Sequence, residues 1–290
     1  MNKISIILSL LFFYFLGFYK AQKIEMYFPY FAGKTYEFII FQGSQSLTVL
    51  TDTIPKDGKF SLTIPQEYAP YKGMSRWLIT GTKEGGGLDM YIPGNDFSVS
   101  CKESKPSNKN IIYTNNTGNN NLNELYQKQE IIFQRYDAML RAIKAFDKTD
   151  KNYSVFKYEL REQQNEYKVF QNALKTKYDY LGQFIQIVNI TRGKGNKLLE
   201  KENDRAENIT NYIANELDWQ TLYTSGHWSS IISSWVSIHT QVLKDPKKFT
   251  IEYRKINSII KTPDLRMDFS EKVRYYLTQQ KQDIYLKIIK

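Results

Sequence analysis

The spacing of hydrophobic residues changes once along the chain, from every second position to every third or fourth position. Phe60, Leu62 and Ile64 alternate with polar neighbours, which is the pattern of a strand with one buried face. In the second half, hydrophobic residues recur at the spacing of an amphipathic helix. The sequence therefore predicts an α+β fold, in which an antiparallel β-sandwich-like domain (22–103) precedes an all-α helical domain (122–290).

Turn signals divide the first region into about seven short strands. The strongest turn is the segment 55–58, because Gly58 can adopt the positive φ that other residues resist. Short antiparallel strands at this spacing are typical of a small sandwich or barrel. The expected strands lie at 24–28, 35–41, 47–51, 60–64, 74–80, 88–92 and 97–101.

The segment 104–121 is rich in Ser, Asn, Lys and Thr and poor in hydrophobic residues. This composition is typical of a linker or a loosely packed surface segment. Within it, only the run 111–113 has the residues for a brief strand. We therefore expect a linker between the two domains.

The helical region contains several amphipathic stripes, the clearest of which joins Ile132, Tyr136, Met139 and Ile143. Asp245 and Pro246 can start a later helix as its N-cap and first residue. Short connections between such helices favour a helical layer or bundle. The expected helices lie at about 132–146, 153–174, 178–191, 199–217 and 228–242, with two more after 246 and 263.

The first 21 residues have the three-part form of a secretory signal peptide. Lys3 supplies the positive charge, a hydrophobic run follows, and Ala21 provides a small residue for cleavage. Lys20 interrupts the run after roughly 15 residues, whereas a membrane anchor needs about 20. Cleavage is therefore favoured over retention as an anchor. We expect a periplasmic or secreted protein with no membrane span after signal cleavage.

The chain carries a formal net charge of +10. A basic protein can bind nucleic acid or an anionic surface, but such binding requires clustered basic residues. Acidic and basic residues instead alternate through the second half, as between Lys151 and Lys168. The charge is therefore interpreted as a solvated surface, and no nucleic-acid partner is expected.

Cys101 is the only cysteine, and the chain has only 2 histidines. Exchange between thiols and disulfides needs an attacking thiolate and usually a second cysteine. Cys101 ends a predicted strand on the same face as Phe97 and Val99, which indicates a buried sulfur in the core. Lys102 beside it leaves open a thiol of lowered pKa. No catalytic, metal-ligating or cofactor-binding residue is predicted.

The segment 222–230 is the densest cluster of aromatic and hydroxyl side chains. One interpretation is a helix start, capped by Thr224 or Ser225, with packed tryptophans. A second is a ligand groove lined by the aromatic side chains. Hydrolysis through a histidine and a serine is a third and weaker one, because no G-x-S-x-G turn is present. The candidate ligand or partner patch consists of Trp219, Tyr223, His227, Trp228 and Trp235.

Five strings carry a resemblance to a known family. Three of them, QKIEMYFPYFAGKTYEFIIFQG, TDTIPKDGKFSLTIPQEYAPYKGM and GGGLDMYIPGNDFSVSC, resemble the β-rich N-terminal domain (DUF4369 type) of exported Bacteroidetes-type proteins. Two more, FIQIVNITRGKG and ELDWQTLYTSGHWSSIISSWV, look like the helical middle region of that family. Its members are thioredoxin-like thiol–disulfide interchange (AhpC/TSA-like) proteins. The resemblance implies a β-domain followed by a helical region.

The family's redox centre is a C-x-x-C motif on a C-terminal thioredoxin-like domain, and this chain contains no such motif. The resemblance therefore implies a non-catalytic recognition or scaffold region of such an exchange protein, with the redox domain missing. Its partner would be a thioredoxin-like redox domain or an envelope protein. The alternative is a stand-alone protein that binds a ligand or a protein in the cell envelope. An enzymatic activity of this chain is not expected.

Overall fold

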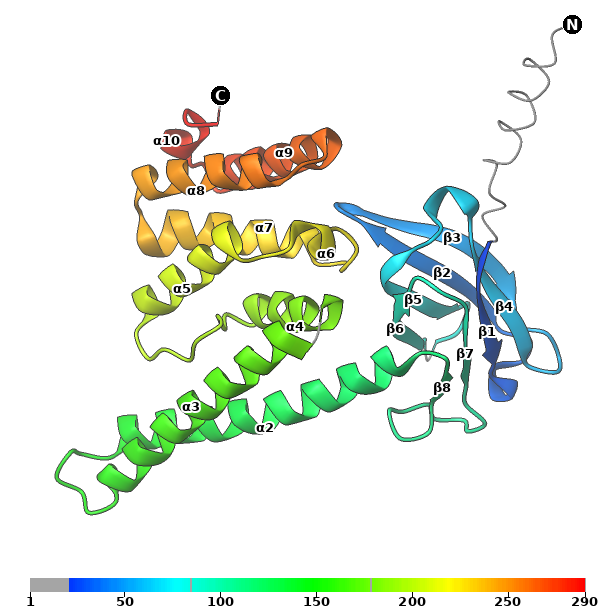
Figure 1. Ribbon diagram of the computed structural model, residues 1–290, viewed down its shortest axis with the longest axis horizontal. Coiled ribbons are helices and arrows are strands. Elements are labelled where there is room, and N and C mark those ends of the chain that lie inside the picture. Colours follow the sequence, from blue (N-terminus) through cyan, green and yellow to red (C-terminus); the bar gives the residue numbers. More distant parts are fainter. Residues whose placement is uncertain (1–20, 84, 178, 290) are drawn as a thin grey trace, which may run out of the picture.

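The computed structural model describes residues 21–83, 85–177 and 179–289. Nearly all of the expected signal segment, residues 1–20, lies outside this range. Two sheets at the N-terminal end are followed by helices up to the C-terminal end, and the two parts lie side by side (Figure 1). The predicted α+β class is thus confirmed. No helix among these residues has the length and hydrophobicity needed to cross a membrane.

The β-domain consists of two four-stranded sheets, with strand orders β4-β1-β7-β8 and β3-β2-β5-β6. Neighbouring strands are antiparallel except for β1 and β7, which run parallel with Ile24 opposite Phe97. Residues buried in β1 alternate with exposed ones, as a strand with one face on a core requires. The strands are β1 (Gln22–Tyr27), β2 (Thr35–Gln42), β3 (Gln45–Thr53), β4 (Lys59–Ile64), β5 (Lys72–Thr80), β6 (Gly87–Pro93), β7 (Phe97–Ser100) and β8 (Ile112–Thr114).

A hydrophobic core fills the space between the two sheets. Trp77 lies at its centre, with its ring 4.8 Å from that of Phe28 and 5.7 Å from that of Phe60. Aromatic pairs at such distances add to the free energy gained by burial. Leu62 and Ile64 are fully buried in the same cluster, as their alternation in the sequence predicts.

The segment expected to be a linker contributes to both domains. The run 112–114 forms β8 and pairs with β7, and α2 begins at Thr117, before the expected position 122. Asn116 caps this helix, since its side chain accepts a hydrogen bond from Gly118 N at 3.1 Å. A polar segment can therefore be well ordered when its amides satisfy neighbouring backbone groups.

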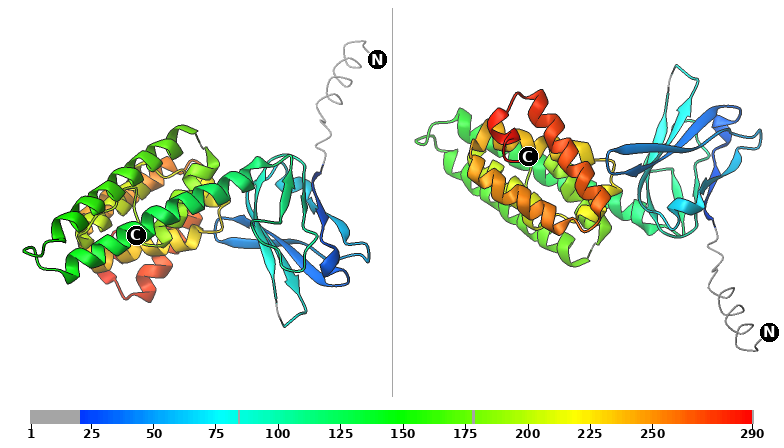
Figure 2. Two further views of the ribbon diagram at one scale, coloured as in Figure 1. Left: turned by 90° about the horizontal axis from the view of Figure 1, so that it is seen from below. Right: turned by 90° about the horizontal axis from the view of Figure 1, so that it is seen from above.

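The helical domain contains nine helices within the described residues, stacked next to one another from α2 and α3 to α9 and α10 (Figures 1 and 2). Asp245 and Pro246 start α8 as predicted, and Asp245 accepts hydrogen bonds from two backbone N–H groups. The helices are α2 (Thr117–Ala145), α3 (Tyr153–Lys177), α4 (Tyr180–Thr191), α5 (Glu202–Asn215), α6 (Trp219–Tyr223), α7 (Trp228–Ser237), α8 (Pro246–Ile259), α9 (Pro263–Gln279) and α10 (Asp283–Leu286).

The helix predicted over residues 228–242 changes its type halfway. After α7 the chain continues as a π-helix, Ile238–Leu243, which ends where Lys244 adopts a left-handed conformation with φ of 52°. Periodicity does not distinguish this turn from an α-helix, because the hydrophobic stripe continues through it. The π-turn places His239 in the core beside Glu252, with 2.8 Å between His239 Nε2 and Glu252 Oε2.

Candidate functional site

The two domains meet where β5 and the β2–β3 turn reach α4 and the segment after α6. Two backbone hydrogen bonds cross this junction: Gly43 N donates to Tyr223 O at 2.7 Å, and Met74 N donates to Thr224 O at 2.9 Å. A third contact joins the Ser44 hydroxyl to the Asp268 carboxylate at 2.7 Å. The helical segment thus continues the hydrogen bonding of the sheet, which fixes the two domains relative to each other.

Two buried tyrosine hydroxyls reinforce the junction. Tyr71 donates its hydroxyl proton to Met74 O at 2.7 Å and accepts from Phe41 N at 3.1 Å. Tyr180, from α4, donates to Thr224 O at 3.0 Å. Burial raises the pKa of both phenols above its ordinary value, so both remain protonated donors.

A glycine allows the close approach at this point. A Cβ atom on Gly73 would lie 2.5 Å from Thr224 Cβ and 2.8 Å from the ring of Tyr71. No side chain fits there without displacing the junction. A glycine inside a strand is a known sign of close backbone approach, and it is the one local signal of this interface that the sequence contains.

A second buried contact secures α2 to the sheet. Asn116 and Asn119 both donate to Tyr91 O, at 2.8 and 2.9 Å, while Tyr91 N donates to Asn119 Oδ1 at 2.8 Å. The Tyr91 ring stacks on that of Tyr180, with 5.0 Å between the ring centroids. Because every polar group of this contact is paired, the junction is expected to behave as one rigid unit.

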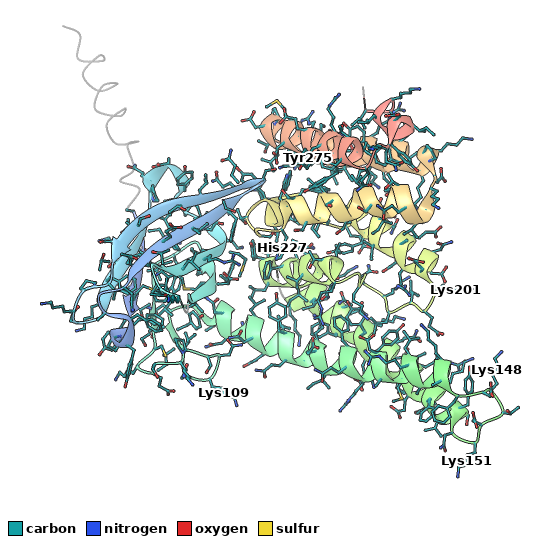
Figure 3. The ribbon with its side chains drawn as sticks, turned by 180° about the vertical axis from the view of Figure 1, so that it is seen from behind. Lys109, Lys148, Lys151, Lys201, His227 and Tyr275 are labelled. Atoms are coloured by element: carbon teal, nitrogen blue, oxygen red, sulfur yellow. The ribbon has the colours of Figure 1, made fainter. Side chains whose placement is uncertain are left out.

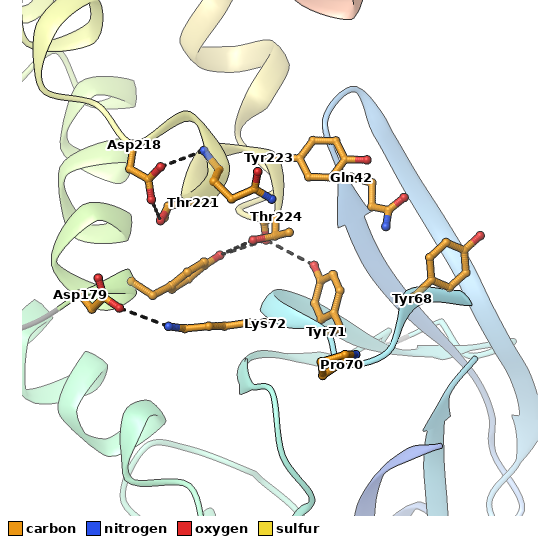
Figure 4. A pocket seen from close by; sticks show the side chains of 12 residues that line it. Gln42, Tyr68, Pro70, Tyr71, Lys72, Asp179, Asp218, Thr221, Tyr223 and Thr224 are labelled. Carbon is orange, nitrogen blue, oxygen red and sulfur yellow. Dashed lines mark hydrogen bonds and ion pairs between the residues drawn. The ribbon is translucent and has the colours of Figure 1, made fainter. Parts of the chain in front are cut away.

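A cleft of about 340 Å³ opens beside this junction, with walls from both domains (Figure 4). Tyr68, Tyr71 and Lys72 line it from the β-domain, and Asp179 and Tyr223 line it from the helical domain. Lys72 Nζ lies 3.3 Å from Asp179 Oδ2, and both side chains are largely exposed. The cleft therefore combines flat aromatic surfaces with one positive group, Lys72, and two carboxylates, Asp179 and Asp218.

Asp218 lies on the helical side of the same cleft and caps α6. Its Oδ1 accepts from Gln220 N at 3.0 Å, and its Oδ2 accepts from the Thr221 hydroxyl at 2.7 Å. These bonds hold the start of α6 in the orientation that points Tyr223 toward the β-domain (Figure 4). The local sequence thus positions one side chain of the predicted patch in the cleft.

The three tryptophans of the predicted patch lie in the core of the helical domain. Trp228 and Trp235 are 0% and 1% exposed, and Trp219 packs against Trp228 with 5.5 Å between ring centroids. Trp235 Nε1 donates to Glu252 Oε2 at 3.2 Å inside the core. Trp228 and Trp235 therefore present no surface to a ligand, Trp219 lines a separate cavity beside Ile260 and Leu265, and of the aromatic patch only Tyr223 lines the junction cleft.

His227 lies at the end of the helical domain that faces the sheets (Figure 3). Its ring is 5.8 Å from that of Phe184, and burial lowers its pKa. Ser225 Oγ donates to Leu222 O at 2.8 Å and accepts from His227 N at 3.0 Å, so this serine is held by the backbone. Helix α7 starts here with His227 as its N-cap and without a capping side chain, so the expectation that Thr224 or Ser225 caps it is wrong. The geometry does not support the interpretation as a hydrolase.

Cys101 is buried at the edge of the β-domain core, as its position in the strand pattern predicts. Its sulfur lies 3.6 Å from Asn110 Oδ1 and 3.6 Å from Glu103 O. These contacts close the loop after β7 over the sulfur. The thiol therefore acts as a packing group.

Among the described residues, no group of three or more His, Cys, Asp or Glu side chains is arranged to hold a metal ion.

The sequence analysis did not identify Tyr71, Lys72, Asp179, Tyr180 or Thr224 as site residues. Tyr71 and Thr224 are 153 positions apart in the chain, so no local pattern connects them. Comparison with known proteins adds no further assignment: no family model, no curated protein and no solved structure matches the chain.

Proposed function

We propose that this chain is a non-catalytic binding protein of the cell envelope whose ligand lies in the junction cleft. The observation that supports this function is a cleft built from both domains and held by fully paired buried groups. Ligand sites occur preferentially at domain interfaces, where apolar surface and a few fixed polar groups converge. The envelope location rests on the signal-like first 21 residues.

The cleft suits a small polar molecule that carries both a positive and a negative group. Lys72 and Asp179 form an ion pair across it, and such an exposed pair stabilises the protein by less than about 1 kcal/mol. A zwitterionic ligand can replace this pair with two of its own at little energetic cost. Tyr68 and Tyr223 would then cover the apolar part of the ligand.

A thermal-shift screen with amino acids and short peptides tests the proposal. A ligand that binds only the folded protein raises the melting temperature, by mass action. Tyr223→Ala and Lys72→Met should each abolish the shift, while Tyr158→Ala, at an exposed tyrosine on α3, should leave it unchanged. A shift that persists in both cleft variants would place the ligand elsewhere.

The scaffold role in thiol–disulfide exchange, which the resemblance implied, remains a second proposal. The rigid junction favours it, because a scaffold must hold two surfaces in one geometry. Buried Cys101 is in no position to exchange its sulfur with a substrate. Adding the protein to an insulin reduction assay with dithiothreitol should leave the rate at background. Turnover above background would contradict both proposals.

A further inference from the structure

Two further cavities lie along α3, and the first of them adjoins the junction cleft, because Asp179 and Asp218 line both. The first, of about 420 Å³, is bounded by α3, α4 and α5, and Gln171, Gln183 and Gln186 line it. The second, of about 480 Å³, lies between α3 and the segment before α5. Gln171 and Lys175 line both cavities, so the two form one continuous groove.

The first cavity contains buried amides without partners. Gln186 is 4% exposed, and within the part of the chain that the structure describes neither its Oε1 nor its Nε2 has a hydrogen-bond partner. Gln171 is equally buried, and its Nε2 also lacks a partner there. A buried polar group left unpaired costs about 1–3 kcal/mol, so each one requires an explanation.

Another amide pair in the same domain shows that the fold can satisfy such groups. Gln129 Nε2 donates to Asn189 Oδ1 at 2.8 Å, and Asn189 Nδ2 donates back to Gln129 Oε1 at 2.7 Å. Asn189 Nδ2 also donates to Tyr167 Oη at 3.1 Å. Those amides are paired inside the protein, whereas Gln171 and Gln186 line a cavity. Their missing partners are therefore expected to come from a molecule in that cavity.

The amide geometry indicates which group that molecule carries. Gln186 offers one acceptor and two donors within a single planar group, and Gln171 offers further donors beside it. Gln183 Oε1 accepts from Tyr212 Oη at 2.9 Å, so the Gln183 side chain is fixed with its Nε2 available as another donor. Neighbouring hydroxyls, each both donor and acceptor, match this set, and a sugar ring carries several of them side by side.

The second cavity is lined by positively charged side chains. Its lining residues include Lys168, Lys175 and Lys197, the amides of Asn165 and Asn172, and no acidic side chain. Lys175 also pairs with Glu216, whereas Lys168 and Lys197 are exposed on the two walls. The first cavity is lined by the carboxylates of Asp179, Glu216 and Asp218, so a ligand that extends over both cavities would place its acidic group in the second one, between Lys168 and Lys197.

We propose that this groove binds an acidic oligosaccharide, with the hydroxyls of one sugar unit on Gln171 and Gln186 and a carboxylate of the neighbouring unit between Lys168 and Lys197. The site belongs to the helical domain and does not require a ligand in the junction cleft.

Calorimetric titration of the full chain with uronic-acid hexasaccharides (galacturonate, mannuronate and hyaluronan types) tests this site, with maltohexaose as the neutral counterpart. We expect at least one uronic-acid hexasaccharide to bind more tightly than maltohexaose. Gln186→Met keeps the length of the side chain and removes the amide, so it should weaken binding at least tenfold. The matched control is Gln163→Met, at a buried glutamine of α3 that is not among the residues lining either cavity, and it should leave binding unchanged.

A second pair of variants tests whether the positive charge of Lys168 contributes to binding. Lys168→Gln should weaken binding of the uronic-acid hexasaccharide and leave that of maltohexaose unchanged, whereas Lys157→Gln, at an exposed lysine of the same helix, should change neither. Equal binding to wild type and Gln186→Met would mean that water alone fills the cavity, and would overturn the proposal. Absence of binding to every saccharide, or binding of hexaglutamate in their place, would overturn it as well. Tyr223→Ala, which tests the junction cleft, should leave saccharide binding intact.

Discussion

The two domains differ in how many buried polar side-chain atoms lack a hydrogen-bond partner. Within the described residues of the β-domain, Trp77 Nε1 is the single buried side-chain atom without a hydrogen-bond partner. The described helices contain all the others, together with the paired amides Gln129 and Asn189 and the ion pair of His239 with Glu252. Both domains thus have a hydrophobic core, and the interior of the helical domain contains polar clusters in addition.

This difference matters for selectivity, because hydrophobic cores and buried polar groups constrain a structure to different degrees. A hydrophobic core stabilises a fold without selecting one detailed arrangement, whereas buried polar groups are favourable only when their partners are correctly placed. In the described part of the helical domain, some polar groups find these partners inside the protein, Gln171 and Gln186 line a cavity, and others, among them Gln163 Oε1, lack a partner and line neither cavity of the groove. The two binding sites proposed above accordingly lie in the helical domain and at the junction.

The largest loss of stability is expected when a tryptophan is removed from the core of either domain. Trp77→Ala and Trp228→Ala should each lower the free energy of unfolding by about 3–5 kcal/mol, because each leaves a large cavity. Urea denaturation followed by circular dichroism measures this change. Tyr30→Ala, at an exposed tyrosine, should change it by less than about 0.5 kcal/mol. If Trp228→Ala instead left stability intact and abolished ligand binding, Trp228 would belong to a binding surface.

A smaller loss is expected from the buried ion pair. Glu252 Oε2 receives the Trp235 indole N–H at 3.2 Å and lies 2.8 Å from His239 Nε2. Glu252→Gln can keep an oxygen beside both groups, but it removes the charge that strengthens these hydrogen bonds and the carboxylate oxygen that lies 3.6 Å from Lys248 Nζ, which should cost about 1–3 kcal/mol at neutral pH. The exposed Glu159→Gln provides the matched control. A neutral result for Glu252→Gln would mean that packing alone holds this region.

The same pair predicts a pH dependence. Burial alone would raise the pKa of Glu252, but the hydrogen bond and charge of His239, the Trp235 N–H and Lys248 outweigh burial and hold the pKa below its ordinary value of 4.5. A carboxyl with a lowered pKa in the folded state stabilises the protein above the pKa of the unfolded chain, and this contribution is lost as the pH falls through the lower folded value. The difference in stability between wild type and Glu252→Gln should therefore shrink as the pH falls below 4.5.

A substitution at the domain junction should lower stability by a similar or smaller amount. Gly73→Ala places a Cβ atom 2.5 Å from Thr224 Cβ, so the strand or the segment after α6 must move. Overpacking of this kind costs about 1–3 kcal/mol. Limited proteolysis should then cut between the domains faster than in wild type. Gly73 does not have a positive φ, so the expected loss comes from crowding and not from backbone strain; Gly94→Ala, at a turn with φ of 96° where a Cβ atom would meet no neighbour, strains the backbone without crowding the junction and should leave cleavage between the domains unchanged.

The sequence predicts those features that depend on neighbouring residues. The alternation around Leu62 and the pair Asp245–Pro246 identified a strand and a helix start, because each records a local requirement of the backbone. The junction could not be predicted this way, since Met74 binds Tyr180 and Thr224, which are more than a hundred positions away. Nor does the aromatic cluster show by itself which rings face solvent, because a core helix and a ligand groove require the same residue types.

The smallest effect on stability is expected at the ion pair of the junction cleft. Lys72 and Asp179 are 3.3 Å apart, but the side chain of Asp179 is 97% exposed, so water and salt screen the attraction. Lys72→Met should lower stability by less than about 1 kcal/mol, and less still at high salt. The same variant is expected to abolish the ligand-induced thermal shift, because a ligand in the cleft excludes the water that screens Lys72 in the free protein. A variant that loses binding with almost no loss of stability would assign Lys72 to recognition, whereas a stability loss of several kcal/mol would assign it to the structure of the junction.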